Sequence, residues 1–194
     1  MSTGQPLRVG VGQADISPAN GIQLAGAGTS WRGAQGVADP LYAKALVFDQ
    51  GDTRFCFLSL DVCGVTAEWS APLRAEIAGL AACSPDAVML HGSQTHSGPF
   101  AGNYLLKGAH CRYVTEDTWW LYGHDPRYHE PFRQGVLAAV RQALAGLRPA
   151  RMKAARAMDG RISWNRRFLF RDGSSGTHPG NCYQHNLRPM GAAD

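Results

Sequence analysis

No apolar run in the 194 residues approaches the ~20 residues that a membrane-spanning helix requires. The first residues, Met1–Pro6, contain neither a basic segment nor an apolar core, so no secretory signal peptide is predicted. The five cysteines are widely spread and include no CxxC pair, which favours reduced thiols over a disulfide framework. Together these absences predict a cytoplasmic protein without a transmembrane segment.

Several motifs that would indicate a particular class of function are also missing. The glycines of Gly21–Gly36 lie at spacings that match no phosphate-binding loop, so this segment is predicted to be a surface loop. No Gly-x-Ser-x-Gly sequence occurs, which argues against the nucleophile elbow of an α/β hydrolase. The basic residues of Arg148–Arg171 do not cluster on one helix face, and the net charge is only +4. Nucleic acid is therefore not an expected partner.

What the chain does contain is the composition of a globular domain, with 44% hydrophobic and 18% charged residues. A domain of this size buries about 70% of its unfolded surface. Apolar patterning predicts four strands and two helices. The strands are Leu7–Ile16, Leu41–Phe48, Arg54–Asp61 and Ala87–Leu90, and the helices are Thr66–Ala82 and Pro131–Leu147.

The order of these elements predicts an α/β fold with a mixed β-sheet and flanking helices. The turn at Asp49–Asp52 joins two strands into a hairpin, and the first helix makes a crossover between parallel strands. Phe55–Leu60 and Ala87–Leu90 are almost continuously apolar. We therefore expect them to be neighbouring interior strands of a sheet that is covered on both faces.

The C-terminal part is predicted to add short strands to the same domain. Met152–Ala157 and Ile162–Asn165, joined by Asp159-Gly160, have the pattern of a hairpin, and Phe168–Phe170 that of a further strand before a turn at Asp172-Gly173. Residues 181–194 show no helical or strand period and are expected to form an irregular tail. No repeat or second domain is visible, so a single domain over 1–194 is expected.

Polar side chains follow the strand Ala87–Leu90, from His91 to Pro99. Ligands of open α/β sheets bind where strands end, so this stretch is a candidate site, although an ordinary strand exit has the same pattern. Asp61, at the end of another strand, either belongs to such a site or caps the next turn.

The stretch Phe100–Glu130 is long, irregular and rich in aromatic residues, which indicates an ordered lid or pocket wall. His124 and His129 lie within it, and their separation fits no standard helical pair of metal ligands. They are predicted to be packing or solvated residues.

Several segments, in order, resemble the N-terminal catalytic domain of the neutral/alkaline, non-lysosomal ceramidase family. Gln94–Pro99 is similar to the family signature Thr-His-Thr-His-Ser-Gly-Pro. The other matching segments are Val9–Ser17, Asp39–Phe48, Phe55–Asp61 with its final Ser-Leu-Asp, and Ile162–Arg167 with its Asn-Arg pair. The resemblance covers about residues 7–180 and implies the front half of a larger catalytic domain, that is, an incomplete one.

The resemblance implies hydrolysis of the amide bond of an N-acylsphingosine or similar N-acyl lipid by water activated on zinc, which lowers the pKa of bound water to about 7. The family's first signature histidine is a zinc ligand, and here that position is Gln94. The family's second signature histidine corresponds to His96, which the resemblance therefore implies is a catalytic residue and a possible zinc ligand. Arg166 corresponds to the active-site arginine. Asn165, Ser97 and Gly98 are the implied substrate-binding residues.

Two departures from the family pattern leave two hypotheses open. Glutamine is a poor zinc ligand, and the family's remaining ligands and its catalytic serine belong to later segments. The chain is therefore either part of a ceramidase-like hydrolase, truncated and inactive by itself, or a non-catalytic family member that keeps the pocket as a binding module. In either case we expect His96 and Arg166 to face one cleft, with Asp61 at its floor.

Overall fold

The computed structural model divides the chain into two compact units, residues 1–151 and residues 152–194, which are described separately. The structure describes residues 5–26, 31–103, 114–159, 161, 167–170, 172–177 and 188–189.

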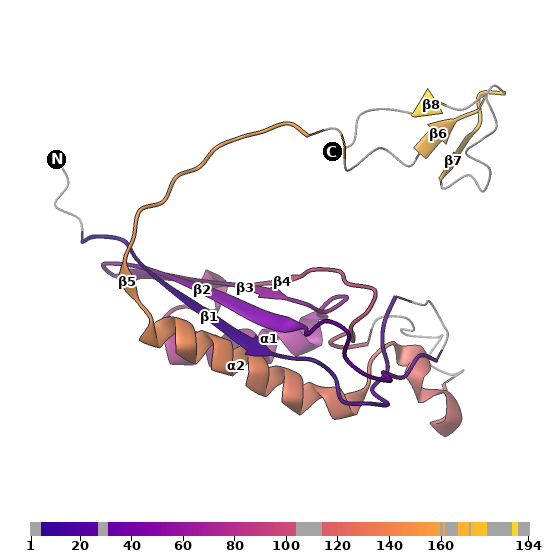
Figure 1. Ribbon diagram of the computed structural model, residues 1–194, viewed down its shortest axis with the longest axis horizontal. Coiled ribbons are helices and arrows are strands. Elements are labelled where there is room, and N and C mark those ends of the chain that lie inside the picture. The colour runs from indigo at the N-terminus through magenta and orange to yellow at the C-terminus, as the bar shows by residue number, and fades with distance from the viewer. Residues whose placement is uncertain are drawn as a thin grey trace. The chain divides into compact units, whose positions relative to one another are not determined.

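The first unit is built on a five-stranded sheet with the order β4-β3-β2-β1-β5 (Figure 1). Its strands are β1 (Arg8–Asp15), β2 (Tyr42–Gln50), β3 (Thr53–Leu60), β4 (Val88–Gly92) and β5 (Arg148–Pro149). The helices are α1 (Ala67–Ala81) and α2 (His129–Ala145), with short 3-10 turns η1 (Pro85–Ala87), η3 (Glu116–Tyr122) and η4 (Pro126–Tyr128). The β1–β2 and β2–β3 pairs are antiparallel, whereas β3 and β4 are parallel neighbours that α1 connects along the chain. The predicted α/β class, hairpin and crossover are thus confirmed.

Helix α2 lies directly on β1 because that strand carries glycines where the helix crosses it. A Cβ atom at Gly10 would lie 1.8 Å from the carbonyl oxygen of Ala143, and one at Gly12 would lie 1.9 Å from that of Ala139. The helix backbone therefore touches the strand backbone. Around this contact the core is filled by the inward residues of β2 and β3 and the apolar stripes of both helices.

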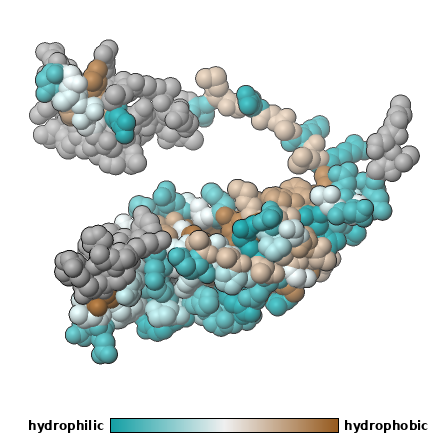
Figure 2. All heavy atoms as spheres, turned by 180° about the vertical axis from the view of Figure 1, so that it is seen from behind, coloured by the Kyte–Doolittle hydropathy of each residue, from teal (hydrophilic) through white to brown (hydrophobic). Residues whose placement is uncertain are grey.

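Both helices lie on one side of the sheet, as Figure 1 shows, and they contact each other there. The opposite face of the described sheet bears apolar side chains that reach solvent, with exposed fractions of 62% for Val11, 37% for Phe55 and 51% for Met89. Apolar surface among hydrophilic residues is also visible in Figure 2. The expectation that both faces are covered is therefore wrong for the described residues.

The expectation that Ala87–Leu90 forms an interior strand is also wrong, because β4 is at the edge of the described sheet. It does neighbour β3, as predicted. A short apolar run indicates burial of at least one face but does not show whether a strand lies on both sides of it. In β4 the burial alternates, with Val88 inside and Met89 outside, which is the pattern of a strand covered on one face.

In the part of the chain that the structure describes, no helix combines the length and the apolarity needed to cross a bilayer.

The second unit contains a small antiparallel sheet with the order β7-β6-β8. Its strands are β6 (Arg167–Leu169), β7 (Ser175–Thr177) and β8 (Arg188–Pro189). The predicted strand and turn are confirmed, because β6 and β7 form a hairpin in which the amide of Phe170 donates to the carbonyl of Ser174 at 2.8 Å.

The strand predicted at Met152–Ala157 is wrong, because residues 151–159 form no regular structure and are exposed throughout. Small and basic residues predominate in this segment, so it has no apolar face that a partner strand could bury. Gly160 and Ile162–Asn165, which complete the predicted hairpin, lie outside the described residues.

Candidate functional site

The candidate site is the loop Gln94–Pro99, called the signature loop below, which follows the edge strand β4. Because β3 and β4 are parallel, their C-terminal ends lie at the same end of the sheet. The amide of Gln94 donates to the carbonyl of Val62 at 3.1 Å, and the amide of Cys63 donates to the carbonyl of Pro99 at 3.0 Å. Backbone hydrogen bonds therefore hold the loop against the segment that follows β3.

Gln94 and His96, the two residues that the resemblance assigns to the signature histidine positions, are exposed to solvent. Gln94 adopts a left-handed backbone conformation with a φ of 60°. His96 is exposed as well, which a role in binding or catalysis requires. Its backbone carbonyl accepts a hydrogen bond from the guanidinium of Arg32, and the backbone of Gly26 packs against its side chain.

Ser97 and Gly98 differ in accessibility. Ser97 is exposed, and its amide donates to the hydroxyl of Thr95 at 3.2 Å. Gly98 is buried, and a Cβ atom there would lie 3.0 Å from a methyl group of Leu41. Its carbonyl accepts a hydrogen bond from the amide of Ala25 at 2.9 Å. Gly98 therefore lies at the base of the loop, whereas Ser97 lies at its surface.

In the described residues the carboxylate of Asp61 holds the start of β2 and not the turn that follows Asp61, which corrects the predicted cap. Its carboxylate accepts a hydrogen bond from the amide of Tyr42 at 3.1 Å and pairs with the ammonium of Lys44 at 3.8 Å. The carboxylate thus fixes the start of β2. Its backbone carbonyl oxygen would lie 3.2 Å from a Cβ atom at Gly98.

A cavity of about 390 Å³ opens beside the signature loop. Ser17, Thr95 and Ser97 contribute to its lining, and most of the other lining residues are aliphatic. The other lining residues are Pro18, Leu24, Ala34, Gly36, Val37, Ala38, Asp39 and Leu41. Apolar walls with a few polar groups are typical of a small-molecule site.

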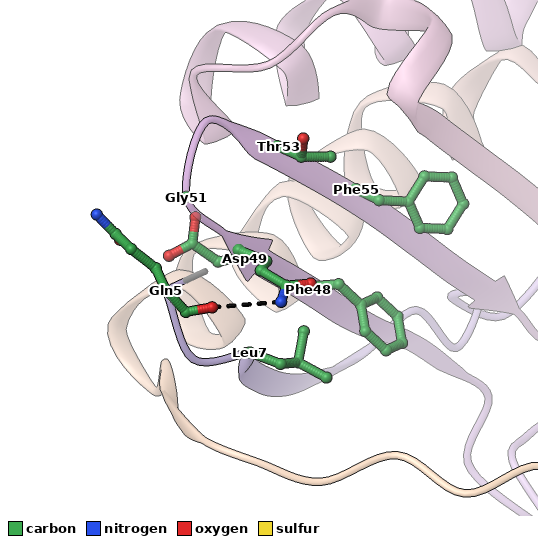
Figure 3. Close-up of a pocket in the computed structure, with 8 residues that line it drawn as sticks. Gln5, Leu7, Phe48, Asp49, Gly51, Thr53 and Phe55 are labelled. Atoms are coloured by element: carbon green, nitrogen blue, oxygen red, sulfur yellow. Dashed lines mark hydrogen bonds between the residues drawn. The ribbon is translucent and has the colours of Figure 1, made fainter. Parts of the chain in front are cut away.

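A second cavity, of about 440 Å³, lies at the opposite end of β3 (Figure 3). The side chains of Leu7, Phe48 and Phe55 point to one side of the sheet there, and the side-chain amide of Gln50 donates to the backbone carbonyl of Gln5 at 3.2 Å. The cavity adjoins the β2–β3 turn, whereas the signature loop follows the other end of the sheet. None of the predicted site residues lines it.

Arg166 and Asn165 lie outside the described residues. The shared cleft of His96 and Arg166 therefore stays a prediction.

His124 and His129 pack on the indole of Trp69, with ring centroids 5.6 Å and 4.3 Å from it. This is the packing role predicted for them. Burial lowers the pKa of His124, and the nearby Asp125 carboxylate only partly offsets that effect.

The described residues of the signature loop do not fit a catalytic zinc site by themselves. They offer one imidazole and one side-chain amide, whereas a catalytic site takes about three protein ligands. Among the residues that the structure describes, no group of three or more histidine, cysteine or acidic side chains could hold a metal.

Sequence reasoning did not identify Gly26 and Arg32, which contact the signature loop from the glycine-rich segment. A glycine with a left-handed φ of 92° and an arginine six residues later form no motif. Only the fold brings them to the loop.

Comparison with known proteins gives the family. The sequence model for "Neutral/alkaline non-lysosomal ceramidase, N-terminal" matches residues 7–168. The chain belongs to this family. A search of curated protein sequences gave no match.

Two solved ceramidase structures share the fold of this family member. A neutral ceramidase from Pseudomonas aeruginosa is 20% identical, with a TM-score of 0.58. A structure described as ceramidase complexed with C2 is 22% identical, with a TM-score of 0.56. Each match covers 75% of this chain and 22% of the other, so this chain spans about a fifth of the length of those proteins.

Proposed function

We propose that this ceramidase-family chain contributes the signature loop and its neighbouring cavity to a hydrolase that cleaves the amide bond of an N-acylsphingosine or a similar N-acyl lipid. The observation that carries the proposal is the family match over residues 7–168, together with an exposed His96 at the end of parallel strands. An imidazole in such a position is suited to hold or transfer a proton at the reacting amide.

The cavity beside the loop supports a lipid substrate. Aliphatic side chains such as Leu24, Val37 and Leu41 suit an alkyl chain, and the hydroxyls of Thr95 and Ser97 suit its polar end. As the family resemblance implies, Arg166 is proposed as a catalytic residue and Asn165 as a substrate-binding residue. Because the family match continues across the boundary at residue 151, we infer that both units belong to one partial N-terminal domain over 1–194.

The zinc that the family implies would need ligands beyond the described residues. We propose that these come from other polypeptide of the catalytic domain, so the 194-residue chain alone has little or no amidase activity. The limited coverage of the ceramidase structures, 22% of each, supports this proposal.

A non-catalytic role is the second candidate, and Gln94 is the observation that favours it. A glutamine at the first signature position removes an imidazole from the family's zinc site, while the cavity and the loop remain. Such a protein would bind an N-acyl lipid without hydrolysing it.

One set of assays tests these proposals. The purified chain is incubated with a fluorescent N-acylsphingosine and zinc, and both turnover and binding are measured. Turnover by the chain alone would contradict the need for further ligands. Turnover only by a longer polypeptide supports the hydrolase, binding without turnover in both supports the non-catalytic role, and neither binding nor turnover in the longer polypeptide would reject the lipid substrate.

A further inference from the structure

Arg32 occupies an unusual place in the contact between the glycine-rich segment and the signature loop. One terminal nitrogen of its guanidinium, Nη2, donates to two backbone carbonyls, that of Ala25 and that of His96. Its own amide donates to the side-chain oxygen of Gln23 at 2.8 Å, and its carbonyl accepts from the amide of Leu24 at 2.8 Å. Hydrogen bonds thus hold both the backbone and the guanidinium of Arg32. The guanidinium joins the glycine-rich segment to the signature loop.

Two further contacts lie beside this bridge. The amide of Ala25 donates to the carbonyl of Gly98 at 2.9 Å, and the backbone of Gly26 touches the side chain of His96. The guanidinium is also close enough to the thiol of Cys63 to oppose the rise in pKa that burial causes there. Arg32 therefore joins the glycine-rich segment to the loop that carries His96, and its charge also acts on Cys63 of the segment after β3.

The charge of Arg32 is not balanced by a carboxylate. Among the described residues no ion pair includes Arg32. Every acidic residue of the chain except Asp194 is described. In addition, Nε of the guanidinium is buried and has no hydrogen-bond partner in the described part of the chain. Arg32 is half-buried, and its described charge-assisted contacts are therefore the two backbone carbonyls that its Nη2 bridges.

We propose that Arg32 is a positioning residue that holds His96 in place by bridging the carbonyls of Ala25 and His96. The proposal rests on the proposed function for the role of His96. The contact itself is independent of that role. A guanidinium suits this task because its donors are fixed in one plane, so that the two carbonyls are held at a defined separation.

The chain provides a matched control in Arg74. Its guanidinium also bridges two backbone carbonyls, those of Pro85 and Val88, at 3.1 Å and 3.0 Å from Nε. Pro85 begins η1 and Val88 begins β4, whereas His96 follows the end of that strand. Arg74→Met removes a similar bridge at a distance from the signature loop.

The test is a nuclear Overhauser measurement on the 194-residue chain with labelled histidine and glycine. Cross-peaks between the His96 ring and the α protons of Gly26 are assigned with His96→Gln. We expect Arg32→Met to remove these cross-peaks and Arg74→Met to keep them. We also expect the melting temperature of Arg32→Met to fall no further than that of Arg74→Met. Arg32→Lys keeps a charged donor and should restore part of the intensity.

Wild-type cross-peaks in Arg32→Met would overturn the proposal. If Arg32→Met does not fold, Arg32→Lys replaces it: weakened cross-peaks in the folded variant support the proposal, and cross-peaks of wild-type intensity overturn it. The proposal would also be overturned if both Arg32 variants lost the cross-peaks because they had unfolded. That result would show that Arg32 has a general role in stability. In a longer polypeptide that hydrolyses the lipid, Arg32→Met should lower kcat about 100-fold with little change in KM, as expected for a misplaced reacting group. A lack of amidase activity would contradict the proposed function and would leave the cross-peak result intact.

Discussion

Gly26 limits where the side chain of His96 can lie. A Cβ atom at this position would be 2.5 Å from the Cβ of His96, and the φ of 92° is unfavourable for any residue with a side chain. Gly26→Ala is therefore expected to destabilise the chain by about 1–3 kcal/mol and to shift the His96 ring resonances. Chemical denaturation and NMR spectra measure the two effects.

Gly51→Ala is the control for Gly26→Ala. Gly51 also has a positive φ, of 62°, but a Cβ atom there meets nothing within 4 Å. Gly51→Ala should lower the stability of the chain through its strained backbone, without any change in the His96 ring resonances. If the His96 resonances shift equally in both variants, the packing of Gly26 on His96 is not their cause.

His124 should make stability depend on pH. Burial lowers the pKa of this histidine below its ordinary 6.5, so the unfolded chain binds the proton more tightly than the folded chain does. Its contribution to stability is complete above pH 6.5 and decreases as the pH falls toward the folded-state pKa. His124→Gln should therefore reduce the slope of melting temperature against pH between about 7 and 5. An unchanged slope would contradict this assignment.

At the scale of elements, the contact between β1 and α2 should tolerate no side chain. Gly10→Ala and Gly12→Ala place a methyl group against the carbonyl oxygens of α2 and should each destabilise the chain by about 1–3 kcal/mol or more. Gly79→Ala, in α1, meets nothing within 4 Å and should stabilise it by about 0.4–1 kcal/mol. Urea denaturation of the three variants tests the opposite signs.

The elements of the first unit were predictable because each carries a strong periodic signal. The helix predicted over Pro131–Leu147 begins and ends within two residues of α2, and the hairpin of β2 and β3 follows from its turn. The edge position of β4 was not predictable, because apolar residues show that a strand is buried and not what lies beside it. The exposed segment 151–159 was wrongly predicted to contain a strand for a related reason. A sequence pattern does not show whether a second strand is present to pair with the segment.

The candidate site could be predicted only where it lies within one segment of the sequence. His96, Ser97 and the strand before them follow from local pattern and from the signature. Arg32 and Gly26 could not be found this way, because they contact His96 across more than sixty residues of chain. The hydrogen bond by which Asp61 holds the start of β2 was not predicted either, because it joins residues 19 positions apart that form no local pattern.

For the whole molecule, the segment 151–159 should be the first site of proteolysis. It is exposed, has no regular structure and contains Arg151, Lys153 and Arg156. Limited trypsin digestion should release a fragment that ends there, and the first unit should keep its circular dichroism signal and its cooperative melting. Mass spectrometry identifies the cut. Earlier cleavage within β1 to β4 would contradict the division into two units.

The pairing of β1 with α2 also bears on how the protein is made. Strand β1 spans Arg8–Asp15, yet the helix that covers it is His129–Ala145. During synthesis at about 5–20 residues per second, β1 would leave the ribosome roughly 6–24 seconds before its covering helix. Until then the first strands have no helix over β1, which leaves Gly10 and Gly12 in contact with water or with a chaperone. Completion of the first unit therefore depends on a helix that is synthesised more than a hundred residues after β1.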